Sequence, residues 1–232
     1  MRIAGLLAVS AMVAACSQSV GGQAEPPGTN LSAAPPRATT PTLSPAPRTP
    51  SRTPSAGAPI EDVIAWIEAG PAADPGAFHE AFLDGVTTPL GDDIAFTAGA
   101  GAPDDTTRCV TDAAYNSGGL TCLLELNSPT PRPAGGEGVW KAGWIDYAGA
   151  SMQVGSLHGD PGPFVEGNGP RLTDGQSLAF GDFRCRSDTA GLFCANYAHR
   201  TAAGISAEGV VAFGCLQAVT RPPPDAGAMY SC

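Results

Sequence analysis

The chain has 232 residues, with 12 Lys and Arg against 22 Asp and Glu and a formal net charge of −10. This acidic balance argues against nucleic acids and anionic lipid headgroups as partners, because both repel a negatively charged surface. The 30 glycines and the low share of charged residues, 15%, favour a loop-rich, mainly β exported protein over a helical one.

The first fifteen residues have the pattern of a secretory signal. Arg2 is followed by an uncharged run, Ile3 to Ala15, that is too short to cross a bilayer core of ~30 Å as a helix. The sequence Val13-Ala14-Ala15-Cys16 resembles the lipobox of bacterial lipoproteins. This resemblance implies cleavage before Cys16 and a diacylglycerol on its thiol. We therefore predict a signal peptide over residues 1–15 and a protein anchored to the extracytoplasmic face of the cell membrane; a plain signal peptide with an incidental Cys16 is the alternative.

Residues 16–58 have the composition of a disordered linker. Ten prolines lie between Ser17 and Pro59, and no aromatic residue precedes Trp66. Such a segment cannot bury enough apolar surface to offset its ordering entropy. We predict a spacer that holds a globular extracytoplasmic domain, residues 59–232, away from the membrane. Its Thr-Pro and Ser-Pro pairs also match O-glycosylated stalks.

The remaining cysteines form an even set, which in an exported chain predicts three disulfides. A metal site is the alternative, but the chain contains no Cys-x-x-Cys pair. Six cysteines allow fifteen pairings, so the number of cysteines alone cannot select one. The six are Cys109, Cys122, Cys185, Cys194, Cys215 and Cys232.

Local geometry favours one pairing. A hairpin centred between Thr189 and Ala190 would place Cys185 opposite Cys194. Cys109 and Cys122 flank a second hairpin turn, which needs a bulge or a longer loop. Cys215 and Cys232 are then left, and their bridge would tie the C-terminal segment to the body of the domain.

Two helices are predicted at the start of the domain. The first runs from Pro59 to Gly70, where Pro59 suits a helix start and Gly70-Pro71 a stop. The second runs from about Asp74 or Pro75 to Leu83, with Asp74 as the N-cap and with Phe78 and Phe82 at the i,i+4 spacing of a helix. The apolar face of the first helix comprises Ile60, Val63, Ile64, Trp66 and Ile67.

Beyond Gly91 the pattern changes to short strands separated by Gly, Pro, Asn and Asp. We therefore predict a mainly β domain: a disulfide-stapled antiparallel sandwich or small barrel preceded by one or two short helices. The predicted strands are 94–96, 108–111, 120–126, 143–147, 151–157, 177–180, 183–186, 192–198 and 209–213.

One stretch resembles a known type of module. The pattern of Leu172 to Asn196, with Cys185 and Cys194, is similar to a module of actinobacterial, especially mycobacterial, exported lipoproteins of unknown function. The similarity spans roughly 92–215 and departs after Asn196, where Tyr197-Ala198-His199-Arg200 replaces a glycine-rich stretch. It implies an exported location, this fold type and the disulfides, but no chemistry.

The sequence contains no familiar catalytic motif: no Gly-x-Ser-x-Gly, P-loop, Gly-x-Gly-x-x-Gly or His-Glu-x-x-His. We predict that His79 is a surface or half-buried histidine on the second helix. His158, beside Asp160, could be a general base or weak metal ligand, but an exposed turn is the simpler interpretation. His199 shares a candidate hairpin with Asp188, where a structural role is again simpler. We predict no catalytic residue, no metal and no cofactor.

The functional prediction is a non-enzymatic, membrane-anchored envelope lipoprotein whose domain binds an envelope protein, lipid or glycan. The alternative is an extracytoplasmic envelope hydrolase with an unrecognised active site. A lipid or glycan carrier predicts an apolar cavity inside the domain. An enzyme predicts a pocket in which His158 or His199 meets a carboxylate.

Overall fold

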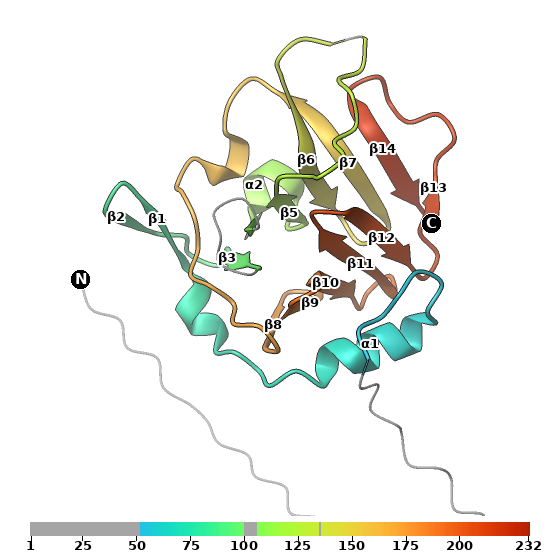
Figure 1. Ribbon diagram of the computed structural model, residues 1–232. Helices are drawn as coiled ribbons and strands as arrows, with labels where there is room; N and C mark the ends of the chain where they lie inside the picture. Colours follow the sequence, from blue (N-terminus) through green and yellow to red (C-terminus); the bar gives the residue numbers. More distant parts are fainter. Residues whose placement is uncertain (1–51, 100–105, 135) are drawn as a thin grey trace, which may run out of the picture. The chain divides into compact units, whose positions relative to one another are not determined.

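Two antiparallel sheets face each other in the computed structural model of this chain, which describes residues 52–99, 106–134 and 136–232 (Figure 1). The predicted signal peptide, Cys16 and most of the predicted linker lie outside the described residues. The fold is the predicted disulfide-stapled, mainly β domain, and it is a sandwich rather than a closed barrel. Among the described residues, no helix is long and apolar enough to span a membrane.

The larger sheet has seven strands in the order β13-β14-β7-β6-β5-β4-β3. Strands β3 to β7 are consecutive in the chain and form an antiparallel meander. The C-terminal strands β14 and β13 extend the sheet beyond β7. The strands are β3 Ala95–Ala98, β4 Thr107–Thr111, β5 Leu120–Leu123, β6 Val139–Tyr147, β7 Ser151–His158, β13 Gln217–Ala218 and β14 Ala226–Ser231.

The smaller sheet has five strands in the order β12-β11-β10-β9-β8, each paired with its neighbour in the chain. Alternate residues of both sheets point into a shared apolar core, which includes Phe96, Ile145, Leu178 and Leu192. The strands are β8 Ser177–Phe180, β9 Phe183–Asp188, β10 Gly191–Asn196, β11 Thr201–Ser206 and β12 Gly209–Phe213.

Three disulfides staple this sandwich, and they follow the pairing favoured from the hairpin geometry. Cys109 on β4 lies directly opposite Cys122 on β5. The second bridge joins directly opposed residues of β9 and β10 in the other sheet, Cys185 and Cys194. The third disulfide joins the residues that follow β12 and β14, Cys215 and Cys232.

Helix α1, Ile60–Glu68, covers the outer face of the five-stranded sheet. Its buried residues Val63, Trp66 and Ile67 belong to the predicted apolar face. The Trp66 ring meets Phe193 of β10 edge-on, with the ring centroids 5.1 Å apart. The first predicted helix is therefore confirmed, one or two residues shorter at each end.

The predicted second helix, Asp74 to Leu83, is wrong. The Asp74 carboxylate does cap a turn by accepting from the Gly76 N–H, but the turn is a short 3-10 segment, Pro75–Phe78. The chain then forms a hairpin of β1, Glu80–Leu83, and β2, Val86–Pro89. The two residues between the strands, Asp84 and Gly85, have φ angles of 50° and 84°, which suit a tight hairpin turn. This Asp-Gly signal outweighs the helical spacing of the two phenylalanines.

Two short helical segments connect to or pack on the seven-stranded sheet. Helix α2, Ala113–Asn116, joins β4 to β5. A 3-10 turn at Gly162–Phe164 places Phe164 against Trp144 of β6, with ring centroids 5.3 Å apart. This turn lies within the glycine-rich segment that follows β7.

Candidate functional site

A cleft of about 370 Å³ opens at one end of the sandwich. The seven-stranded sheet contributes the end of β3, the start of β4 and the chain just after β5, and the other wall is formed by the β9–β10 and β11–β12 turns. We call it the end cleft. Its lining residues are Gly99, Thr107, Leu124, Glu125, Asn127, Asp188 to Leu192 and Ser206 to Glu208.

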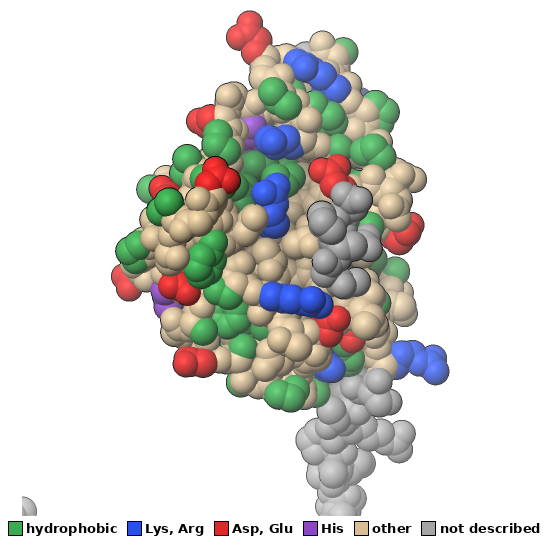
Figure 2. Space-filling model, turned by 60° about the vertical axis from the view of Figure 1, so that its left-hand side comes forward, with side chains coloured by type: hydrophobic (Ala, Val, Ile, Leu, Met, Phe, Trp, Pro, Cys, Tyr) green, Lys and Arg blue, Asp and Glu red, His purple; other side chains and the backbone are tan. Residues whose placement is uncertain are grey.

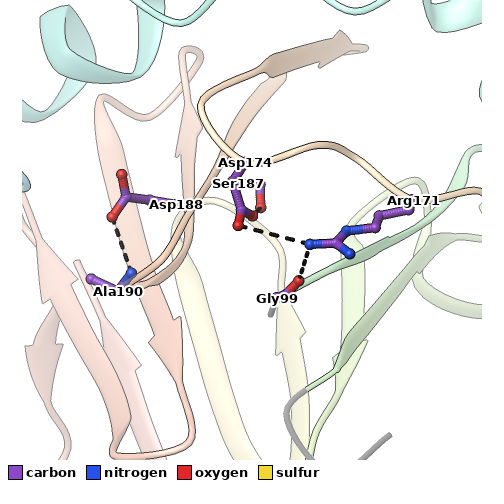
Figure 3. Close-up of polar contacts among 6 residues, drawn as sticks. All are labelled: Gly99, Arg171, Asp174, Ser187, Asp188 and Ala190. Atoms are coloured by element: carbon purple, nitrogen blue, oxygen red, sulfur yellow. Dashed lines mark hydrogen bonds and ion pairs between the residues drawn. The ribbon is translucent and has the colours of Figure 1, made fainter. Parts of the chain in front are cut away.

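A chain of polar contacts holds the walls of the end cleft together (Figure 3). Arg171 donates to the Gly99 carbonyl at 2.7 Å and lies 3.8 Å from the Asp174 carboxylate. The hydroxyl of the fully buried Ser187 donates to Asp174 at 2.7 Å. Because Gly99 follows β3 and Ser187 lies on β9, these contacts connect the two sheets. They are structural, and the Asp188 carboxylate, which accepts from the Ala190 N–H, caps its own turn.

Three carboxylates face the end cleft, but they do not form a metal site. Glu125, Asp188 and Glu208 line it, and Glu208 accepts from the Asn127 side-chain amide at 2.7 Å. Over the part of the chain that the structure describes, no three His, Cys, Asp or Glu side chains converge as metal ligands.

Two further depressions, of about 300 and 330 Å³, lie beside the end of β5. They share Arg108, Leu123, Leu124 and Glu125, so we treat them as one surface, the face groove. Leu124 and Glu125 also line the end cleft, which makes the depressions continuous with it. The remaining lining residues are Thr106, Asn168, Leu126, Pro129 and Val139 to Gly143.

The local sequence explains why the sheet is hollowed there. Strand β5 ends at Leu123, whereas β6 begins at Val139 and pairs with β5 only from Trp144 onwards. Between Lys141 and Ile145 the register of β6 against β7 shifts through a bulge. The small residues Ala142 and Gly143 lie at this bulge, so few side-chain atoms fill the space. Bulges are common next to binding sites because they redirect a strand and its side chains.

Two cationic side chains flank the face groove. Arg108 comes from β4 and Lys141 from β6. Arg108 lies 5.6 Å from the centre of the Phe164 ring and makes a long hydrogen bond, 3.4 Å, to Asn168. Among the described residues, neither cation forms an ion pair, whereas Arg200 and Arg171 do. Figure 2 shows Lys and Arg side chains along a line across one face of this acidic protein.

The histidines lie at three separate places, outside the residues that line the end cleft and the face groove. His79 bonds the Asp93 carbonyl at 2.9 Å through Nδ1. His199 lies in the exposed turn between β10 and β11, where its backbone N–H donates to Asn196. His158 ends β7 and stacks on Trp144, with ring centroids 3.6 Å apart.

The environment of His158 favours its neutral form. Burial lowers its pKa below the ordinary value, and nearby Lys141 acts in the same direction, while Asp146 and Asp160 act against it. The Nε2 atom is buried without a hydrogen-bond partner in the described structure. No hydrogen bond joins His158 to a carboxylate among the described residues. The predicted exposed turn is found at Gly159 and Asp160, whereas His158 itself is a half-buried ring at the end of β7.

Sequence reasoning did not single out Arg108 or Lys141. Each is an isolated cation in its strand. They line one groove because β5, which lies between β4 and β6, ends at Leu123. Comparisons with known proteins add no relative, since no family model, curated protein or solved structure matches the chain. The resemblance of the 172–196 segment to exported lipoproteins, and the lipid anchor at Cys16, stay predictions.

Proposed function

We propose that this chain is a membrane-anchored lipoprotein of the bacterial cell envelope whose domain binds another envelope component without catalysing a reaction. The sequence Val13 to Cys16 supports the anchor. Three disulfides in the folded domain support an oxidising, extracytoplasmic compartment, because such bridges are rare where thiols are kept reduced.

The face groove is the observation that carries the binding proposal. Leu123 and the buried Leu124 line it, its flanks carry the cations Arg108 and Lys141, and Glu125 adds one carboxylate. Cations that form no ion pair among the described residues, beside apolar side chains, suit a partner that presents acidic groups on an otherwise apolar or neutral body. An envelope protein, lipid or glycan of that kind fits the groove, whereas the acidic balance of the whole chain disfavours nucleic acid.

An envelope hydrolase is the alternative that the groove residues support less well. General acid–base catalysis needs a titratable group within reach of the substrate, and a carboxylate or metal to orient it. In the described part of the chain, the end cleft and the face groove contain carboxylates but neither a histidine nor a metal-ligand cluster. Binding without turnover, and without a cofactor, is therefore the function that we propose.

The test uses the full chain in a bacterial host. Cells fed an alkyne-tagged palmitate should label the wild-type protein, and Cys16→Ala should abolish the label and release the protein from the membrane fraction. A photoreactive amino acid replaces Val139, which lines the face groove with its side chain 62% exposed, or the exposed Arg221 as a control. We expect a discrete cross-linked adduct at position 139 only, and mass spectrometry then assigns it to protein, lipid or glycan.

Two results would contradict the proposal. A wild-type chain without lipid label would overturn the anchor. Equal adduct patterns at positions 139 and 221, or no adduct at either, would overturn binding through the face groove.

A further inference from the structure

The edge strands of the two large sheets differ in how they are protected. An edge strand presents unpaired N–H and C=O groups, so natural sheets cover or shorten it, or give it charged residues or proline. At β3, the Thr97 N–H donates to the Pro170 carbonyl, and its own carbonyl accepts from Leu172. At β8, Ser177 exchanges two such bonds with the chain at Pro71 and Ala73. Strand β13 has only two residues.

Strand β12, Gly209–Phe213, has none of these protections. It has five residues, and its sequence, Gly-Val-Val-Ala-Phe, contains no charge and no proline. It pairs with β11 on one side, and no backbone hydrogen bond to another described residue covers its other side. Residues Gly209 to Ala212 are all partly exposed. This is an unprotected template for another strand.

The turn before β12 determines which backbone groups face outward. Ala207 and Glu208 form a two-residue turn between Ser206 and Gly209, which are in register. The pair that flanks such a turn exchanges hydrogen bonds, and bonded pairs then alternate along an antiparallel ladder. Val211 therefore bonds to β11, whereas Val210 and Ala212 direct their N–H and C=O groups to the open edge.

This arrangement is self-complementary. Two copies of β12 can pair antiparallel about a two-fold axis at Val211, so that Val210 of each copy lies opposite Ala212 of the other. Both residues face the open edge, and the two pairs would exchange four backbone hydrogen bonds. Because the strand carries no charge, no like charges oppose each other in this register. An isologous contact of this kind closes on itself.

We propose that β12 is a self-association edge, through which two copies of this chain join their five-stranded sheets into one continuous sheet. The partner is a second copy, because the uncharged strand fits its own antiparallel copy with all four outward backbone hydrogen bonds made and no like charges opposed. This inference does not depend on the function proposed for the face groove, which lies beside β5 in the other sheet.

Sedimentation of the full chain, with Cys16→Ser to prevent lipidation, tests the dimer directly. We expect a concentration-dependent dimer with a Kd of about 0.1–1 mM, the range that corresponds to four backbone hydrogen bonds of ordinary net strength. Ala212→Pro removes an outward N–H without breaking a bond to β11, so it should raise the dimer Kd by about tenfold or more. Ala212→Val is the matched control, since it adds similar bulk but keeps the N–H, and it should dimerise like the parent.

A cysteine cross-link tests the register and does not depend on a proline variant that folds. At a non-hydrogen-bonded pair on the two-fold axis, opposing Cα atoms lie ~4.5 Å apart, within disulfide range. Val211→Cys should therefore form a covalent dimer much faster than Val86→Cys at the exposed hairpin tip, where the side chain is 62% exposed. A monomer throughout the concentration range, or Val211→Cys cross-linking no faster than Val86→Cys, would overturn the proposal.

Discussion

The two sheets of the sandwich have different outer faces. Helix α1 covers the five-stranded sheet with an apolar layer, in which Trp66 packs on Phe193. The seven-stranded sheet has no long helix over it in the described structure. Its outer face instead carries a smaller apolar cluster, in which Trp144 packs with Ala81 of the β1–β2 hairpin and with Phe164. A polar network around Trp144 and Asp146 and the face groove beside β5 lie on the same sheet.

We infer that one outer face contributes mainly to stability and the other mainly to binding. A face covered by a helix contributes stability, because its side chains are removed from water. A face covered by a hairpin and turns keeps polar groups and depressions at the surface beside its smaller apolar cluster, where a partner can reach them. We therefore expect substitutions under α1 to act on folding, and substitutions around the face groove to act mainly on binding.

The largest effect is expected from Trp66→Ala. The Trp66 side chain is 2% exposed, and Arg186 stacks over its ring at 4.0 Å. The free energy of unfolding should fall by about 3–5 kcal/mol, because the substitution removes a buried aromatic side chain and leaves a cavity. Urea denaturation measures this change in the free energy of unfolding. Ile64→Ala, on the half-buried side of the same helix, should lower the free energy of unfolding by only about 1–2 kcal/mol. Equal losses in the two variants would show that α1 does not exclude water from the outer face of the five-stranded sheet.

A smaller effect is expected on the other sheet from Trp144→Phe. The Trp144 indole N–H donates to Asp146 at 2.9 Å, and Asp146 accepts a second bond, at 2.7 Å, from the fully buried Thr121. Phenylalanine keeps most of the packing but removes a hydrogen bond to a carboxylate, so unfolding should become easier by about 2–3 kcal/mol.

Trp140→Phe is the matched comparison for this network. Its indole N–H bonds the Thr130 carbonyl at the exposed surface, where water can replace the partner. We expect a loss of about 1 kcal/mol or less. A Trp140→Phe variant that is as destabilised as Trp144→Phe would mean that the buried network adds nothing special to the seven-stranded face.

The sequence predicts elements with local signals better than elements that depend on pairing with their neighbours, in both sheets. The apolar spacing of α1 and the hairpin around Cys185 and Cys194 are local signals, and both are found in the structure. Strand β11, Thr201–Ser206, was not predicted, because its Thr-Ala-Ala-Gly-Ile-Ser sequence has weak strand propensity. Pairing with β10 and β12 on its two sides makes it a strand.

The face groove could not be predicted for a different reason. Arg108 and Lys141 are brought together by the point at which β5 ends and by the bulge in β6, and both depend on pairings between distant segments. The β12 edge is an intermediate case: its uncharged sequence is visible along the chain, but the absence of a covering segment is a property of the fold.

The smallest effect is expected from His158, and it concerns pH. Burial against Trp144 lowers the pKa of His158, so the folded protein binds this proton less readily than the unfolded chain does. The free energy of unfolding should therefore be unaffected above the unfolded-state pKa of ~6.5 and decline as the pH falls below it. His158→Phe keeps an aromatic ring against Trp144 and removes the titration, so its decline between about pH 7 and pH 5.5 should be shallower than that of the wild type. Urea midpoints at the two pH values measure the difference, and the chemical shift of the His158 ring proton reports the titration independently. Equal declines in both proteins would mean that the polar side of the seven-stranded sheet accommodates the charged ring, through Asp146 and Asp160, as readily as water does.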